Sequence, residues 1–179
     1  MTDIASGPPR PVTIPGPDPN PHRPRVEFPV GSCDCHAHVF GPQGRFPYLA
    51  QASYMPQDAL PEEYARMLRT IGCQRAVLVQ PSIYGTDNRC MLAAMTSEVF
   101  NFRGVAVVEE TISDSELEAL HRAGVRGVRI NVASKTAVLT MEQAPRLAAR
   151  IKPLGWHLQF FVRIGQSPTF ERDIAGLPV

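Results

Sequence analysis

Two histidines, His36 and His38, are the residues of this sequence best suited to do chemistry. They stand two positions apart, shortly before the dipeptide Gly41-Pro42. In a β-strand, residues i and i+2 point to the same face, so both imidazoles would be directed at one spot. Two convergent imidazoles can hold a metal, polarise a carbonyl group or shuttle a proton. The spacing alone is a weak signal, and its meaning depends on the elements that position the pair.

The chain after residue 31 alternates between short apolar runs, typical of buried strands, and longer segments with apolar residues at helical spacing. We predict strands over 32–38, 75–80, 103–108, 127–131 and 157–164, and helices over 61–71, 88–100, 114–123, 141–154 and 168–175. Asp58 is a candidate N-cap and Gly72 a candidate stop for the first helix, and the third helix begins near Ser113. Serial β-α units with short links predict a parallel α/β barrel or a doubly wound sheet.

The histidine pair falls at the carboxyl end of the first predicted strand. Active sites of parallel α/β barrels collect at that edge of the sheet, which favours a functional role for the pair. No Gly-x-Gly-x-x-Gly follows this strand and no phosphate-binding loop is present, so the pattern counts against a nucleotide-binding fold.

Length and composition favour one soluble globular domain. The chain has 179 residues, a hydrophobic fraction of 44% and a net charge of +1, which gives no electrostatic basis for binding nucleic acid or a membrane surface. No apolar run reaches the roughly 18 residues of a membrane span, and the N-terminus lacks the pattern of a signal peptide. The four cysteines lie in or beside predicted strands and helices, so we expect reduced thiols and a cytoplasmic location.

The first 30 residues differ from the rest, because they hold half of the chain's 18 prolines. Proline removes backbone donors and resists both helix and sheet. We therefore predict a flexible proline-rich arm over residues 1–30 and a folded unit over 31–179.

Six motifs occur in one order along the folded unit. They are Cys-His-Ala-His-Val-Phe-Gly-Pro at 35–42, Arg-Phe-Pro-Tyr at 45–48, Tyr-Met-Pro at 54–56, Val-Leu-Val-Gln-Pro-Ser at 77–82, Gly-Thr-Asp-Asn at 85–88 and Gly-Val-Arg-Gly-Val-Arg-Ile-Asn at 124–131. Together they resemble the amidohydrolase superfamily, and within it the branch of 2-pyrone-4,6-dicarboxylate lactonase and related sugar-acid lactone enzymes. The resemblance covers nearly all of residues 31–179.

The resemblance implies a TIM-type barrel of eight β-α units, which needs about 250 residues. Residues 31–179 hold five such units, so we expect the N-terminal part of a barrel. In the family, the second half carries a histidine, a substrate-binding arginine and an aspartate that activates water. We therefore expect this chain alone to be weakly active or inactive, and to act with a C-terminal half or as a homo-oligomer.

The resemblance leaves the role of a metal open. In metal-dependent members, the histidines that match His36 and His38 bind zinc, together with ligands that end strands four and five. Here those strands end in 129–131 (Arg-Ile-Asn) and 161–163 (Phe-Val-Arg), which do not contain the expected ligands. Catalytic zinc usually has at least three protein ligands, and this segment offers two. We favour a site without a cofactor, in which both histidines are catalytic and contact the substrate carbonyl; zinc held by the same pair is the alternative.

The resemblance also implies substrate contacts. Arg129 matches a carboxylate-binding arginine, and Lys135 falls where the pyrone enzymes have a second arginine. Tyr54 and Ser82 match neutral hydrogen-bonding positions, and Phe161 replaces a tyrosine. Arginine suits carboxylates because its planar fork binds them through two hydrogen bonds. The lysine and the phenylalanine leave room for another acidic lactone, such as that of a sugar diacid.

The expected activity is hydrolysis of the cyclic ester of a di- or polycarboxylic acid, in the catabolism of aromatic or sugar acids. Water would attack a carbonyl polarised by the histidines, and donors would stabilise the developing oxyanion. Two alternatives stay open: a metal-dependent amidohydrolase or decarboxylase, and an inactive fragment that binds a partner through its free sheet edge. Arg129 could also be structural.

Overall fold

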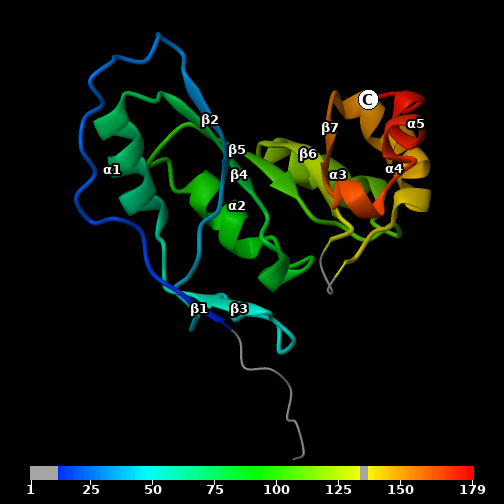
Figure 1. Cartoon of the computed structure of the whole chain (residues 1–179), viewed down its shortest axis with the longest axis horizontal. Coiled ribbons are helices and arrows are strands. Elements are labelled where there is room, and N and C mark those ends of the chain that lie inside the picture. Colours follow the sequence, from blue (N-terminus) through cyan, green and yellow to red (C-terminus); the bar gives the residue numbers. More distant parts are fainter. Residues whose placement is uncertain (1–11, 134–136) are drawn as a thin grey trace, which may run out of the picture.

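The computed structural model describes residues 12–133 and 137–179, and these residues form a parallel sheet curled into half of a barrel (Figure 1). The sheet has the order β2-β4-β5-β6-β7, with every neighbouring pair parallel. Its strands are β2 (Cys33–Ala37), β4 (Arg75–Val79), β5 (Phe102–Ala106), β6 (Val125–Asn131) and β7 (His157–Phe161). The connecting helices are α1 (Pro61–Ile71), α2 (Arg89–Thr96), α3 (Asp114–Arg122), α4 (Ala144–Ile151) and α5 (Phe170–Ala175). The predicted five β-α units and barrel-type α/β class are confirmed.

Three details of the helices differ from the prediction. The N-cap of α1 is Leu60 and not Asp58, because Pro61 occupies the first helical position and Glu63 accepts a hydrogen bond from the Leu60 amide at 3.2 Å. Helix α2 ends at Thr96, shortly before Glu98, whose positive φ of 58° interrupts a helix. The predicted helix over 141–154 is α4 flanked by two 3₁₀ turns, Met141–Gln143 and Lys152–Leu154.

The outer face of the sheet packs against helices α1 to α4 and forms the hydrophobic core. Alternate strand residues face these helices, as expected for a strand period of two. The buried strand residues of this core include Ala76, Leu78, Ala106, Val128 and Ile130, and the buried helix residues include Leu68, Met91, Leu117 and Leu147. Burial of this apolar surface is the main force that holds the half-barrel together.

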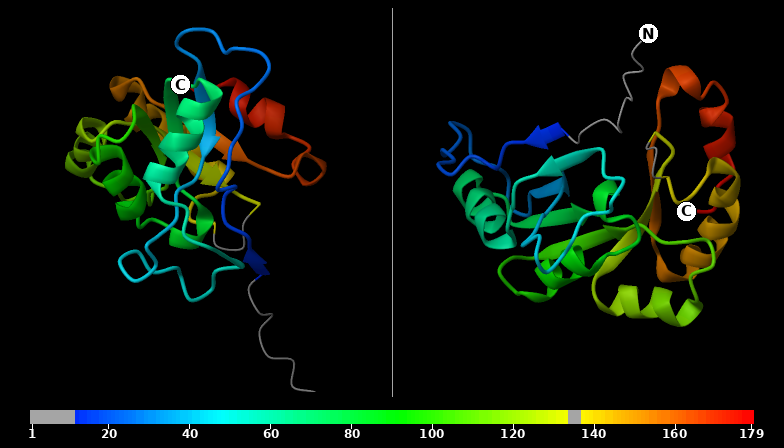
Figure 2. Two further views of the ribbon diagram at one scale, coloured as in Figure 1. Left: turned by 90° about the vertical axis from the view of Figure 1, so that its left-hand side faces the viewer. Right: turned by 90° about the horizontal axis from the view of Figure 1, so that it is seen from below.

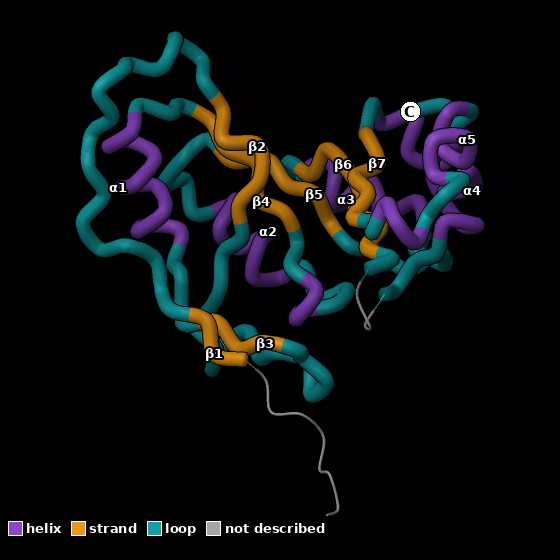
Figure 3. The backbone as a smooth tube through the Cα atoms, in the orientation of Figure 1, coloured by secondary structure: helices purple, strands orange, loops and turns teal. Residues whose placement is uncertain are grey.

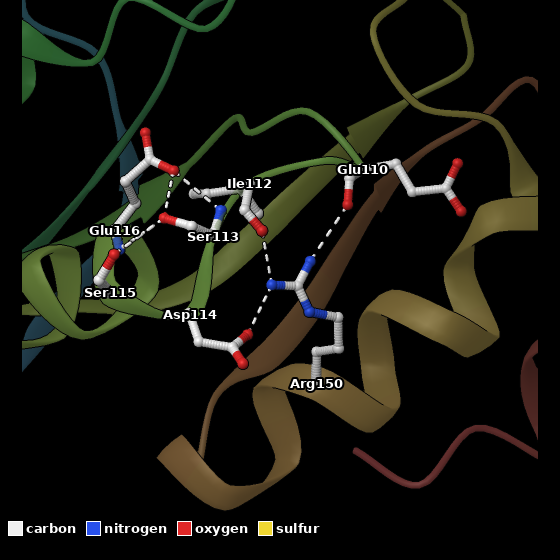
Figure 4. Close-up of polar contacts among 7 residues, drawn as sticks. All are labelled: Glu110, Ile112, Ser113, Asp114, Ser115, Glu116 and Arg150. Carbon is white, nitrogen blue, oxygen red and sulfur yellow. Dashed lines mark hydrogen bonds and ion pairs between the residues drawn. The ribbon is translucent and has the colours of Figure 1, made fainter.

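Hydrogen bonds from Arg150 fix the loop between β5 and α3 to helix α4 (Figure 4). Arg150 donates to the carbonyl of Glu110 at 3.1 Å and to Oδ1 of Asp114 at 2.6 Å. Ser113 is the N-cap of α3, as predicted, and forms a capping box with Glu116. These contacts hold one of the loops at the carboxyl edge of the sheet.

A second sheet, which the sequence did not predict, lies apart from the first (Figure 2). It pairs β1 (Val12–Ile14) in parallel with β3 (Tyr54–Pro56). From β1 the chain runs as a loop alongside α1 to the start of β2 (Figure 3), and Arg66 of α1 donates to the carbonyl of Pro19 at 3.1 Å. The boundary between arm and folded unit at residue 30 stays a prediction.

Within the described ranges, every helix is too short or too polar to cross a membrane.

Candidate active site

The two histidines lie at the carboxyl end of β2, where the strand carries a bulge: His36 falls inside the bulge and His38 directly follows the strand. The register pairs Asp34 with Ala76 and Ala37 with Leu78, so three steps of β2 run beside two steps of β4. Asp34 accepts a hydrogen bond from the Tyr64 hydroxyl of α1 at 2.8 Å, which anchors the start of the bulge on the helix side. The rings of His36 and His38 then lie edge to face, with their centroids 5.2 Å apart. The two imidazoles are therefore neighbours at the end of β2.

The hydrogen bond of His38 defines its tautomer. Its Nδ1 lies 2.7 Å from the carbonyl oxygen of Val79, and a carbonyl can only accept, so Nδ1 carries the proton. Burial lowers the pKa of His38, and the charges of Arg129 and His36 act in the same direction, against the hydrogen bond to Val79. The ring is therefore neutral near pH 7 with a free lone pair on Nε2, which can accept a proton or a hydrogen bond or bind a metal.

His36 is the more exposed of the two imidazoles. Burial lowers its pKa, the positive charge of Arg129 lowers it further, and the carboxylate of Asp34 opposes both. A neutral imidazole still has one N–H to donate, so His36 can offer a hydrogen bond to a carbonyl oxygen.

Arg129 stands on β6 with a side chain that is only 7% exposed. One Nη donates to the carbonyl of Gln80 at 3.3 Å, and the guanidinium carbon lies 5.4 Å from the centre of the Phe161 ring. Burial lowers the pKa of Arg129, and nearby Tyr54 opposes that shift. Among residues 12–133 and 137–179, its Nε has no hydrogen-bond partner and no carboxylate forms an ion pair with it. A buried cation with such sparse partners is suited to receive an anion.

The other predicted contacts fall into three groups. Ser82 and Arg129 line one small cavity of about 10 Å³ at the carboxyl ends of β4 and β6. Tyr54 lies on β3, within electrostatic range of Arg129. Lys135 lies outside the described residues. Another cavity, of about 510 Å³ and lined by residues of α2 and α3, contains none of these residues.

Sequence reasoning missed a set of side-chain amides beside Arg129. Gln80 is fully buried and Asn131 is half-buried, and both line the same small cavity as Ser82. The side-chain oxygens of Gln80, Asn131 and Gln159 have no hydrogen-bond partner among the described residues. The available signal was a polar residue directly at the carboxyl end of a buried strand, as at Gln80 and Asn131.

Among the described residues, a metal ion at this site would depend on His36 and His38. The part of the chain that the structure describes has no group of three or more His, Cys, Asp or Glu side chains placed to hold a metal. Catalytic zinc usually has at least three protein ligands. The described residues therefore offer two of the ligands that a zinc ion would need, His36 and His38.

The comparisons with known proteins agree with this fold. The amidohydrolase family model matches residues 33–178, so the chain belongs to the amidohydrolase family. A 2-pyrone-4,6-dicarboxylate hydrolase of Comamonas testosteroni is 38% identical over 160 residues, which cover 89% of this chain. A 4-sulfomuconolactone hydrolase of Rhizobium radiobacter is 32% identical over 131 residues, 72% of this chain.

A solved structure from Acinetobacter baumannii, described as a probable 2-pyrone-4,6-dicarboxylic acid hydrolase with citric acid bound, superposes with a TM-score of 0.73. It is 26% identical, and the match covers 83% of this chain and 55% of that one. The matched region covers 52% of the Comamonas relative and 44% of the Rhizobium relative. The chain thus spans about half the length of the relatives that it matches.

Proposed function

We propose that this chain supplies the first half of the active site of a lactone hydrolase whose substrate carries carboxylate groups. The observation that carries the proposal is Arg129, a buried cation without an ion-pair partner among the described residues, next to two neighbouring imidazoles. The names of the Comamonas and Rhizobium relatives denote hydrolases of anionic lactones, which supports the same class of substrate.

In this proposal the two histidines have different roles. His38 donates through Nδ1 to the Val79 carbonyl, so in its neutral form it can only accept at Nε2. The contact with the substrate carbonyl therefore falls to His36, whose N–H stabilises negative charge on the carbonyl oxygen as water attacks. The ester C–O bond then breaks and the ring opens. One proton of the water ends on the leaving oxygen, which becomes a hydroxyl group, and the other is released as the new acid ionises to a carboxylate.

Arg129 would hold a substrate carboxylate through its free N–H groups. Lys135 would add a second positive charge, and the hydroxyls of Tyr54 and Ser82 would donate to the remaining oxygens. We place the water-activating group and the rest of the barrel in a C-terminal half or a partner chain, because the relatives are about twice as long as this chain.

The four cysteines are free thiols, in keeping with a cytoplasmic location.

A metal-dependent amidohydrolase is the second candidate, and the tautomer of His38 favours it. An Nδ1–H that is held by a backbone carbonyl leaves Nε2 as a metal ligand, which is the usual arrangement of metal-binding histidines. Metal analysis of the purified protein decides between the two candidates. Stoichiometric zinc that is lost in His38→Ala would establish the second, whereas metal-independent turnover would establish the first.

Citrate binding tests the anion site directly, because it needs no turnover. Citrate is a tricarboxylate, and titration calorimetry can measure its Kd for this chain. We expect Arg129→Met to weaken binding by about 2–4 kcal/mol, or about 30- to 1,000-fold. Arg126→Met is the matched control, since Arg126 lies on the same strand and donates to the carbonyls of His121 and Val125. Equal Kd values for the two variants would mean that Arg129 does not bind the anion.

Turnover tests the reaction itself. We expect the chain alone to hydrolyse 2-pyrone-4,6-dicarboxylate more slowly than about 1 per second, the low end for ordinary enzymes. Wherever turnover is measurable, Arg129→Met should lower kcat/KM for a charged lactone much more than for a neutral one, which has no carboxylate to hold. Equal losses on both substrates would make Arg129 a structural residue.

A further inference from the structure

Tyr54, a proposed substrate contact, is held by an element that belongs to the arm. It lies on β3, and the strand partner of β3 is β1, with Val12 opposite Tyr54. The amide of Val12 donates to the carbonyl of Ser53 at 3.4 Å, and the amide of Gln57 donates to the carbonyl of Ile14 at 3.3 Å. Backbone hydrogen bonds to β1 therefore flank Tyr54 on both sides along the chain.

The same arm reaches the neighbourhood of the histidines. Beyond β1, residues 17–19 (Pro-Asp-Pro) line a cavity of about 90 Å³ whose other walls include His38 and Leu60. The hydrogen bond from Arg66 to Pro19 fixes this segment on α1. All of these arm residues precede the region that the family model matches, residues 33–178. The arm thus contacts the Tyr54 segment and the wall beside His38 independently.

We propose that residues 12–19 are a positioning element of the active site. Strand β1 holds the Tyr54 segment at the mouth of the half-barrel, and residues 17–19 close the wall beside His38. A three-residue strand such as β3 is too short to be stable alone, and ordering it at the moment of binding would lower affinity. Pairing with β1 orders Tyr54 in advance. The inference rests on the proposed function only in treating Arg129 and Tyr54 as one anion site.

The ladder provides a matched pair of variants. In a parallel pair, the N–H and C=O groups of alternate residues face the partner strand, so Val12 and Ile14 face β3 and Thr13 faces away. Val12→Pro removes the donor to Ser53, whereas Thr13→Pro removes a donor that β3 does not use. Both variants introduce the same residue into the same strand and differ only in the lost hydrogen bond.

Two measurements on the full chain test the proposal. Hydrogen exchange of the Gln57 amide, followed by NMR, should be at least about tenfold faster in Val12→Pro and unchanged in Thr13→Pro. The Kd for citrate should rise roughly three- to tenfold in Val12→Pro and less than about twofold in Thr13→Pro. Near-equal melting temperatures of the two variants would show that both remain folded.

A third variant separates positioning from general stability. If β1 acts through Tyr54, Val12→Pro should have no further effect on citrate affinity once Tyr54→Phe has removed the hydroxyl. An undiminished effect in the Tyr54→Phe background, or equal effects of the two prolines, would overturn the proposal. Failure of the wild type to bind citrate would count against the proposed function alone. The proposal on β1 would then be tested by the exchange rate of the Gln57 amide, and equal rates in the two proline variants would overturn it.

Discussion

The two faces of the curled sheet are built by different rules. The outer face is apolar and sealed by helices: Leu78 and Ile130 are fully buried against them. The inner face at the carboxyl edge carries Arg129, Asn131 and Gln159, each with a buried polar atom that has no hydrogen-bond partner among the described residues. Unpaired buried polar groups destabilise a fold. The outer face thus serves stability, and the inner face retains groups that stability alone would not select.

The largest effect should come from the outer face. Leu78→Ala removes a fully buried side chain from the core and should lower the free energy of unfolding by about 2–5 kcal/mol. Its neighbour Val77 alternates to the inner face and is only half-buried, so Val77→Ala should have a clearly smaller effect. Urea denaturation of both variants measures the difference. Equal losses would mean that the two faces do not differ in this way.

Alanine substitutions at two glycines test the difference between the two faces of the sheet through steric contacts. A Cβ on Gly127 would lie 2.7 Å from the His157 ring and 2.9 Å from the His157 backbone oxygen. A Cβ on Gly104 would also be close, at 2.7 Å from the sulfur of Met95, but methionine side chains can adapt. We expect Gly127→Ala to lower the free energy of unfolding by about 1–3 kcal/mol and Gly104→Ala by less. If Gly104→Ala lowered the free energy of unfolding more than Gly127→Ala, strand β7 would be able to move away from the new Cβ more easily than the core side chains can.

The elements around the outer face were predictable because their signal is local. Helix α1 has Tyr64, Met67, Leu68 and Ile71 on one stripe, and both of its ends fall where the spacing places them. It ends at Gly72, which adopts a φ of 88° that few other residues tolerate. A repeating apolar pattern and a glycine stop are both visible without any tertiary contact.

The missed features depend on contacts between distant segments. Strands β1 and β3 have three residues each, too few for a periodic pattern, and β1 lies among prolines that argue against a strand. The bulge after Asp34 arises from the register with β4 and cannot be read from the spacing of His36 and His38. The spacing indicated the histidine pair, but the tautomer of His38 depends on the carbonyl of Val79, which lies 41 residues away in the sequence.

Substitution of Arg129, on the inner face, should affect citrate binding and the free energy of unfolding differently. Its side chain is buried without an ion pair among the described residues, so the cost of desolvating it opposes folding. We expect Arg129→Met to leave the free energy of unfolding within about 1 kcal/mol of wild type, or to raise it, while citrate binding weakens by about 2–4 kcal/mol. A loss of more than about 2 kcal/mol on thermal or urea unfolding would instead assign Arg129 a structural role.

The smallest expected effect is the pH dependence that His38 contributes. Its pKa in the folded protein is lowered by burial, whereas the unfolded chain has the ordinary value of about 6.5. As the pH falls through 6.5, His38 becomes protonated in the unfolded chain but stays neutral in the folded protein. The free energy of unfolding should therefore decrease. The decrease should level off once the pH lies below the pKa of His38 in the folded protein.

His38→Asn can still donate to Val79 but does not titrate, so its unfolding free energy should fall less between pH 7.5 and pH 5.5. His36→Asn should reduce the slope less than His38→Asn, because His36 is more exposed. Equal slopes in wild type and His38→Asn would mean that His38 is not held neutral by the fold.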